Sequence, residues 1–165
     1  MKSILKGLFV LLMTIILTTG CKNNSLDVNN TKTITFKNLS AEIPSAFEKD
    51  NENSSEDFIQ FEFSTDDNSN TCMMRFSKME GYPSSDLKNT VYEGLLNRDD
   101  IEYSSKTING ITWTTGYYTE GVKLIAHSYA TNYNNTLYEF EFEDFGNGDL
   151  CNQAFEKIAN SLKLK

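Results

Sequence analysis

The chain has 165 residues, a formal net charge of −8 at pH 7 and 39% hydrophobic residues. This composition is typical of one globular domain, and the negative charge argues against nonspecific nucleic-acid binding and against electrostatic adhesion to anionic lipid. Most of the basic residues are lysine and asparagine is abundant, which indicates a low-GC Gram-positive source.

The first 21 residues have the pattern of a bacterial lipoprotein signal peptide. Lys2 and Lys6 precede an apolar run over residues 7–17, and the small residues 18–20 lead into Cys21. The run is too short to remain as a membrane-spanning helix. We therefore predict cleavage after residue 20, a diacylglycerol carrying fatty acids such as palmitate on the Cys21 sulfur, and attachment to the extracytoplasmic face of the cell membrane.

Cleavage would remove two lysines and change the formal net charge to −10. Residues 22–31 are polar, rich in asparagine and almost without apolar periodicity, as expected of a linker. We thus divide the chain into a signal peptide (1–20), a lipidated cysteine with a polar tether (21–31) and a single domain (32–165).

The first half of the domain is predicted to consist mainly of short strands. Alternating apolar residues predict strands near 33–37, 39–43, 59–63 and 72–77, with a charged loop over 48–57 and a polar hairpin over 65–71. A helix is then expected from an N-cap at Ser84 or Ser85 to about Arg98, because Leu87, Val91 and Leu95 recur at helical spacing.

A meander of four strands is expected from Ile101 onward. Asn109-Gly110 is typical of a two-residue type I′ hairpin, which sets Lys106 opposite Trp113; a bulge near residues 104–105 would return Ile101 to the apolar side. A second turn is expected at residues 120–121.

The last strand alternates most sharply. Its aromatic residues predict a core face and its glutamates a solvated face: Tyr138, Phe140, Phe142 and Glu139, Glu141, Glu143. Placing Phe140 and Ala126 on one face pairs His127 with Glu139 and Lys123 with Glu143.

The chain closes with an amphipathic helix. Asp149 is the expected N-cap, and the apolar stripe is Cys151, Ala154, Phe155, Ile158, Ala159 and Leu162. The elements together predict an α+β fold in which an antiparallel sheet of about six to eight strands is packed by two helices.

This order of elements resembles the PsbP-like fold. The resemblance rests on the segments LSAEIPSAF (39–47) and INGITW (108–113), on the helix between them and on the closing helix. Many relatives have Trp where this chain has Phe47. Photosystem II extrinsic proteins and small bacterial lipoproteins share the fold, and the resemblance implies an accessory or binding domain without a catalytic centre or cofactor.

The sequence offers little support for an enzyme. His127 is the one histidine, no Ser lies in a GxSxG motif, and neither nucleotide-binding nor zinc motifs occur. The alternative to a binding module is a cell-envelope hydrolase using His127. Asp66, Asn68 and Asn70 have the spacing of a calcium loop, but its Gly and bidentate Glu are missing, so we predict no metal site.

With Cys21 lipidated, Cys72 and Cys151 remain. Both fall on predicted core-facing sets, and outside the cytoplasm they are expected either to form a disulfide or to stay as two buried thiols.

The last candidate is a partner-binding face on the meander. Aromatic residues with polar tips on a solvated sheet face are typical interface anchors, although strands favour such residues for propensity alone. We expect an envelope protein to dock on Tyr118, Ile125, His127 and Tyr129.

Overall fold

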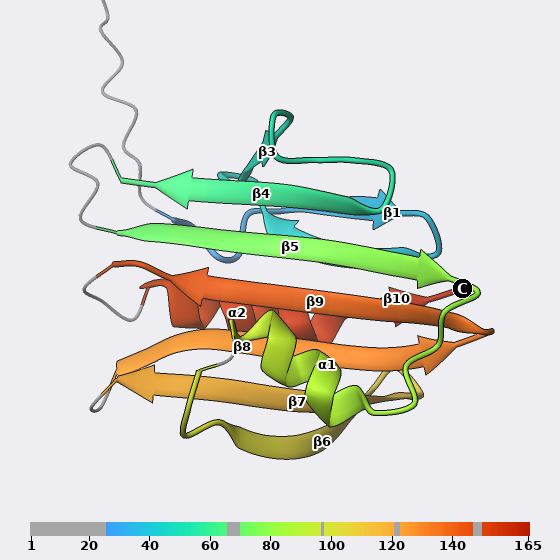
Figure 1. Ribbon diagram of the computed structural model, residues 1–165. Helices are drawn as coiled ribbons and strands as arrows, with labels where there is room; N and C mark the ends of the chain where they lie inside the picture. The colour runs from blue at the N-terminus through green and yellow to red at the C-terminus, as the bar shows by residue number, and fades with distance from the viewer. Residues whose placement is uncertain (1–25, 66–69, 97, 121–122, 147–149) are drawn as a thin grey trace, which may run out of the picture.

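The computed structural model describes residues 26–65, 70–96, 98–120, 123–146 and 150–165, of which 123–125 are described by their backbone alone. Its two antiparallel sheets pack face to face (Figure 1). The smaller sheet has the order β1-β2-β10: β1 (Thr31–Phe36), β2 (Leu39–Pro44) and β10 (Lys163–Leu164). The larger sheet has the order β3-β4-β5-β9-β8-β7-β6: β3 (Glu48–Asp50), β4 (Phe58–Ser64), β5 (Thr71–Glu80), β9 (Thr136–Asp144), β8 (Lys123–Tyr133), β7 (Ile111–Glu120) and β6 (Glu102–Ile108).

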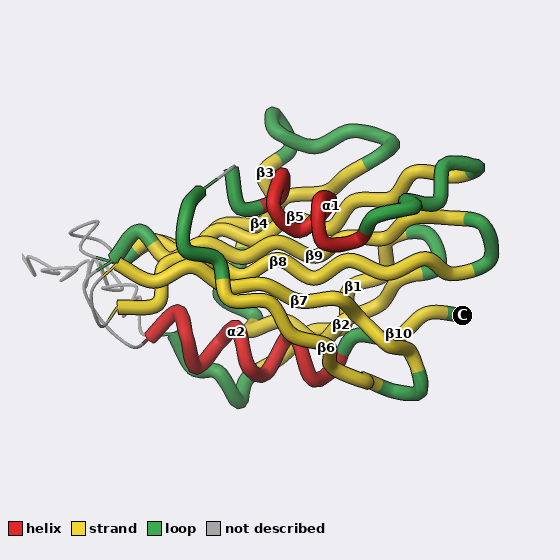
Figure 2. The backbone as a smooth tube through the Cα atoms, turned by 60° about the horizontal axis from the view of Figure 1, so that its bottom comes forward, coloured by secondary structure: helices red, strands yellow, loops and turns green. Residues whose placement is uncertain are grey.

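The two helices lie on opposite faces of the larger sheet (Figure 2). Helix α2 (Leu150–Ser161) and the smaller sheet cover one face, which we call the α2 face, while α1 (Leu87–Gly94) lies on the other, the α1 face. The predicted fold class is confirmed: the described chain is an α+β sandwich with two helices and a mostly antiparallel sheet.

The α2 face holds the main core. The predicted apolar stripe is confirmed: its six residues are buried, five of them in α2 and Leu162 directly after the helix ends. It packs on aromatic side chains that alternate along the strands, with Phe76 and Phe140 stacked at 5.0 Å between ring centroids. The α1 face has a much smaller apolar cluster, made of Val91, Leu95, Ala126, Ala130 and Leu137.

The hairpin at Asn109-Gly110 is as predicted. Both turn residues have positive φ, 48° and 83°, as a type I′ turn requires, and Lys106 lies opposite Trp113. The predicted bulge near residues 104–105 is wrong, because β6 pairs with β7 without interruption from Glu102 to Ile108.

Helix α1 is shorter than predicted. Its N-cap is Asp86 and not Ser84 or Ser85, since the Asp86 carboxylate accepts from the backbone N–H groups of Lys88 and Asn89. The helix ends at Gly94, four residues before the predicted end at Arg98. The predicted cap of α2, Asp149, lies outside the described residues.

The chain joins the core earlier than its composition indicates. Leu26 lies within the predicted tether but is only 6% exposed and belongs to the main core, and β1 starts at Thr31. A short strand, Glu48–Asp50, lies where a charged loop was expected and pairs with β4. After α2 the chain forms another short strand, in which Lys163–Leu164 pairs with β2.

Candidate functional site

One bulge decides which side chains meet on the meander. The pairing of β7 with β8 shifts between Tyr118 and Thr119, and the register passes over Ile125. Because each strand residue changes face with each step, this single extra residue moves the rest of β8 to the other side of the sheet. His127 therefore lies opposite Tyr117 on one neighbour and Phe142 on the other, and the predicted pairing with Glu139 is wrong.

The predicted docking face is accordingly wrong as a single surface. His127 and Tyr129 lie on the α2 face, 9% and 5% exposed, whereas Tyr118 pairs with Ala126 on the α1 face under Arg98. The side chain of Ile125 is not among those described. The bulge has no residue signal of its own, because neither Gly nor Pro marks it.

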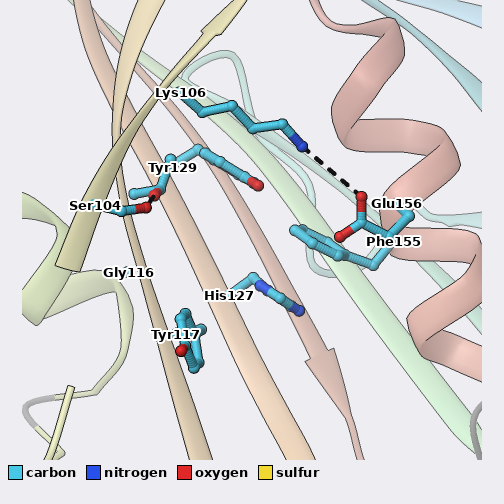
Figure 3. A pocket seen from close by; sticks show the side chains of 9 residues that line it. Ser104, Lys106, Gly116, Tyr117, His127, Tyr129, Phe155 and Glu156 are labelled. Carbon is cyan, nitrogen blue, oxygen red and sulfur yellow. Dashed lines mark hydrogen bonds and ion pairs between the residues drawn. The ribbon is translucent and has the colours of Figure 1, made fainter. Parts of the chain in front are cut away.

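The shift instead builds a pocket between the sheet and α2, which we call the His127 pocket (Figure 3). Its volume is about 210 Å³. Figure 3 shows Lys106 of β6 reaching toward Glu156 of α2, with Tyr129 and His127 projecting from the sheet. The pocket is lined by Ser104, Lys106, Thr115, Gly116, Tyr117, His127, Tyr129, Phe155 and Glu156.

His127 is held as a neutral ring. It stacks on Phe155 with 3.3 Å between ring centroids, and its buried Nε2 has no hydrogen-bond partner among the residues that the structure describes. Burial, with a smaller effect of the Lys106 ammonium, lowers the pKa of His127 to about 3. A histidine in this state offers a neutral donor and acceptor and stays uncharged at physiological pH.

The other polar groups of the pocket are paired along its rim. The hydroxyls of Ser104 and Thr115 share a hydrogen bond of 2.7 Å, and Lys106 Nζ lies 3.7 Å from a Glu156 carboxylate oxygen. Burial raises the pKa of the Tyr129 hydroxyl, so this group remains protonated. The charges at the rim cancel, and the interior carries hydroxyl and imidazole groups between aromatic rings.

The sequence prediction missed Ser104, Lys106, Phe155 and Glu156 as pocket residues. A partial signal exists, because the Asn109-Gly110 turn already places Lys106 opposite Trp113, on the face that α2 covers. Only the bulge brings His127 and Tyr129 to the same place.

The glutamates of β9 are not a solvated face, which corrects the second prediction for this strand. Glu143 is buried, and the side chain of Glu141 is 12% exposed beside Arg75, with 2.7 Å between Arg75 Nε and the carboxylate. Burial raises the pKa values of Glu139, Glu141 and Glu143, that of Glu141 to about 7 against the opposing effect of Arg75. A shallow cavity of about 430 Å³ lies above this row, next to α1.

No group of three or more His, Cys, Asp or Glu side chains suited to a metal occurs within the described part of the chain. Of the calcium-like spacing, Asp66 and Asn68 lie outside that part, and so does Cys21. Cys72 and Cys151 form a disulfide with 5.6 Å between Cα atoms, and it ties α2 to β5. None of the described helices is long and apolar enough to cross a membrane.

Comparisons with known proteins support the fold. No protein-family model and no curated protein sequence matches the chain. The solution structure of the cyanobacterial PsbP (CyanoP) from Synechocystis sp. PCC 6803 is similar over 82% of this chain and 93% of its own, with 11% identity and a TM-score of 0.54. A crystal structure from Bacteroides thetaiotaomicron matches 82% of this chain with 17% identity and a TM-score of 0.49, and this chain spans 48% of its length.

The described domain is thus an α+β sandwich with a PsbP-like fold. At such low identity the similarity concerns the fold alone.

Proposed function

We propose that the protein is a lipid-anchored extracytoplasmic module that binds a ligand or partner and does not catalyse a reaction. The anchor is proposed from the charged start, the short apolar run and the small residues before Cys21. The PsbP-like fold is compatible with an accessory or binding role.

One observation carries the choice of binding over hydrolysis: the chain's single histidine is buried against Phe155 and held neutral. A hydrolase that uses His127 would need this imidazole within hydrogen-bond reach of a nucleophile. Among the described side chains, the nearby Ser104 and Thr115 hydroxyls bond each other, and both cysteines are joined in a disulfide. His127 is better suited to shaping a pocket than to moving protons.

The chemistry of the His127 pocket favours a small molecule without net charge. Lys106 and Glu156 cancel at the rim, His127 stays neutral, and a chain of net charge −8 offers nothing to attract an anion. Hydroxyl groups both donate and accept hydrogen bonds, so a hydroxyl-rich ligand matches a lining that contains Tyr129 and three further hydroxyls. The rings of Tyr117 and Phe155 supply apolar contact.

The anchor is tested by expressing Cys21→Ser and separating membranes from soluble material. The wild-type protein is expected in the membrane fraction and the variant is not. A variant that stays membrane-bound with the same cleavage site would overturn the anchor.

The ligand class is tested by titrating the purified lipidated protein in detergent and following Trp113, the single tryptophan, whose ring lies 6.5 Å from that of Tyr129. Glucose is the neutral probe, with glucuronate and glucosamine as probes of similar size that carry charge. The charged probes should bind more weakly, on the order of tenfold, because their charge would be desolvated without a partner.

Tyr129→Phe, which keeps the ring and removes the hydroxyl, should weaken glucose binding, whereas Tyr103→Phe on the other face serves as the matched control. Equal binding of all three probes, or no response to any, would contradict the ligand class. Turnover of an envelope substrate that is lost in His127→Phe would establish the hydrolase instead.

A further inference from the structure

The distance between the lipid anchor and the folded domain is short. Leu26 is 6% exposed within the main core, and the chain is already held there, because Ser45 N–H donates to the Asn30 carbonyl at 2.7 Å. Five Cα-to-Cα steps separate Cys21 from Leu26, which span about 17 Å when fully extended. Because part of that length lies within the headgroup layer, the point where the chain enters the fold stays close to the bilayer surface.

That entry point lies at one end of the larger sheet. Figure 1 shows the described chain starting, in blue, at the end of the larger sheet where β5 begins and β9 ends. Hydrogen bonds close this end, with Phe145 N–H donating to the Thr71 carbonyl at 2.9 Å and Thr65 N–H to the Asn70 carbonyl at 3.0 Å. We call it the tether end, defined by Thr71 and Phe145.

The tether end exposes large apolar side chains. Phe145 is 57% exposed and follows directly after β9. Leu96 is 60% exposed and lines a small cavity together with Met73 and Glu143. Met73 of β5 pairs with Glu143, the second-to-last residue of β9, so this cavity lies near the same end. Apolar side chains at the level of the lipid headgroups gain from burial in the interface, so their exposure has a physical reason at this end.

The two acidic residues that end β9 do not oppose such a contact. Glu143 is buried with Arg98 Nη2 at 3.9 Å, and Asp144 is 2% exposed. The contact would depend on apolar burial, which agrees with a chain whose negative charge excludes electrostatic attraction to anionic lipid.

We propose that the tether end lies against the phospholipid bilayer, with Phe145 and Leu96 at the headgroup level and the strands leading away from the membrane. This orientation rests on the lipid anchor proposed above. The opposite end carries Tyr82, 76% exposed, just beyond the end of β5. Because β5 has ten residues, Tyr82 would lie roughly 30 Å farther from the bilayer.

The test uses the full lipidated protein in vesicles of phosphatidylcholine and phosphatidylglycerol that contain a nitroxide-labelled lipid near the headgroups. Phe145→Cys or Tyr82→Cys introduces one free thiol for a fluorescent label, since Cys21 is acylated and Cys72 and Cys151 are joined. The label at position 145 is expected to be quenched at least about twofold more than the label at position 82, because nitroxide quenching acts at short range and the two sites differ by the length of a strand. Leu96→Cys provides a second reporter for the same end.

Flotation of the vesicles in the same samples separates the two proposals. Protein that floats and is quenched equally at both ends, or more at position 82, overturns the orientation and leaves the anchor intact. Protein that does not float overturns the anchor and the orientation with it. A matched control inserts twelve Gly and Ser residues after Asn24, which lengthens the tether. We expect the apolar contact to keep the label at position 145 quenched even with this longer tether. Adding Leu96→Ser to the same variant should reduce the quenching.

Discussion

The two faces of the larger sheet are built in different ways, although the same strands supply both. On the α2 face the aromatic residues of β9 stack under a twelve-residue helix, the disulfide closes the layer, and the imidazole of His127 is neutral. On the α1 face the glutamates of β9 lie buried or partly buried beside Arg75 and Arg98, under an eight-residue helix with a small apolar cluster. The first face therefore supplies most of the stability, and the second holds charge.

This contrast also separates the two cavities. The His127 pocket lies against the well-packed face, where rigid aromatic walls favour a defined ligand geometry. The cavity beside α1 is wider, and its glutamates are already engaged by Ser77 and Arg75. Substitutions on one face should therefore change the free energy of unfolding by a different amount, and with a different pH dependence, than substitutions on the other.

The largest effect is expected from the disulfide. Cys72→Ala/Cys151→Ala opens a loop of 79 residues and should lower the free energy of unfolding by about 4 kcal/mol, because the unfolded chain regains the entropy of that loop. Urea denaturation with and without reductant measures the loss. Reductant should destabilise the wild type and leave the double variant unchanged. Alkylation of both thiols in unreduced, unfolded wild-type protein would contradict the bridge.

A smaller effect is expected on the α1 face from Gly116→Ala. The added Cβ would lie 2.5 Å from Val91 Cγ1, so α1 must shift away from the sheet. We expect a loss of about 2 kcal/mol, as is usual for overpacking. Val91→Ala removes the clashing atom, so the double variant should lose less than the sum of the two single variants. Additive losses would show that α1 does not rest on Gly116.

Sequence reasoning succeeded where a local pattern has one structural solution. The stripe of α2 has a single buried side, and Asn109-Gly110 has a single favoured turn, so both were predicted residue by residue. The alternation of β9 also identified its core-facing residues. What it did not reveal is whether the polar side is exposed. A strand with one solvated face gives the same pattern as a strand that is half-covered by a short helix and flanked by Arg75 and Arg98.

The candidate site was predicted less well for a related reason. The two-residue connection between β7 and β8 starts this strand pair in one register. The bulge at Ile125 shifts the pairing by one residue, which moves the side chains of all later residues of β8 to the opposite face of the sheet. No special residue marks the bulge, so His127 and Tyr129 were expected in solvent and are buried. The tether length was misjudged because Leu26 is one apolar residue in a polar segment, and its burial depends on the distant core that it meets.

The two faces are also expected to respond to pH with opposite signs, first through His127. The unfolded chain binds a proton near pH 6.5, whereas burial keeps the folded ring neutral down to about pH 3. Between these values the unfolded state holds more protons, so this ring makes stability fall as the pH is lowered, by about 1 kcal/mol per unit. His127→Phe keeps a ring on Phe155 and should remove this loss. Urea denaturation at pH 6.5 and pH 5 measures it, and an unchanged difference between the two proteins at both pH values would contradict the neutral buried state.

Glu141 is expected to act in the opposite direction and with a smaller total effect. Its pKa is raised from 4.5 to about 7 by burial, so between these values the folded state holds the extra proton and stability falls as the pH rises. In the wild type this slope and that of His127 oppose each other between pH 5 and 6.5, so each hides part of the other. Glu141→Gln, which keeps the shape and leaves the 39%-exposed Arg75 side chain access to water, should reveal the His127 slope.

The variant His127→Phe should in turn reveal the Glu141 slope, of up to about 1 kcal/mol per pH unit, and the double variant should lack both slopes and keep only the pH dependence of the remaining groups, such as Glu139 and Glu143. If the stability of Glu141→Gln depended on pH as that of the wild type does, Arg75 would keep this carboxylate ionised. The α1 face would then tolerate a buried charge pair at neutral pH. Because the two slopes come from residues on opposite faces of the same sheet, the single and double variants measure the two faces independently.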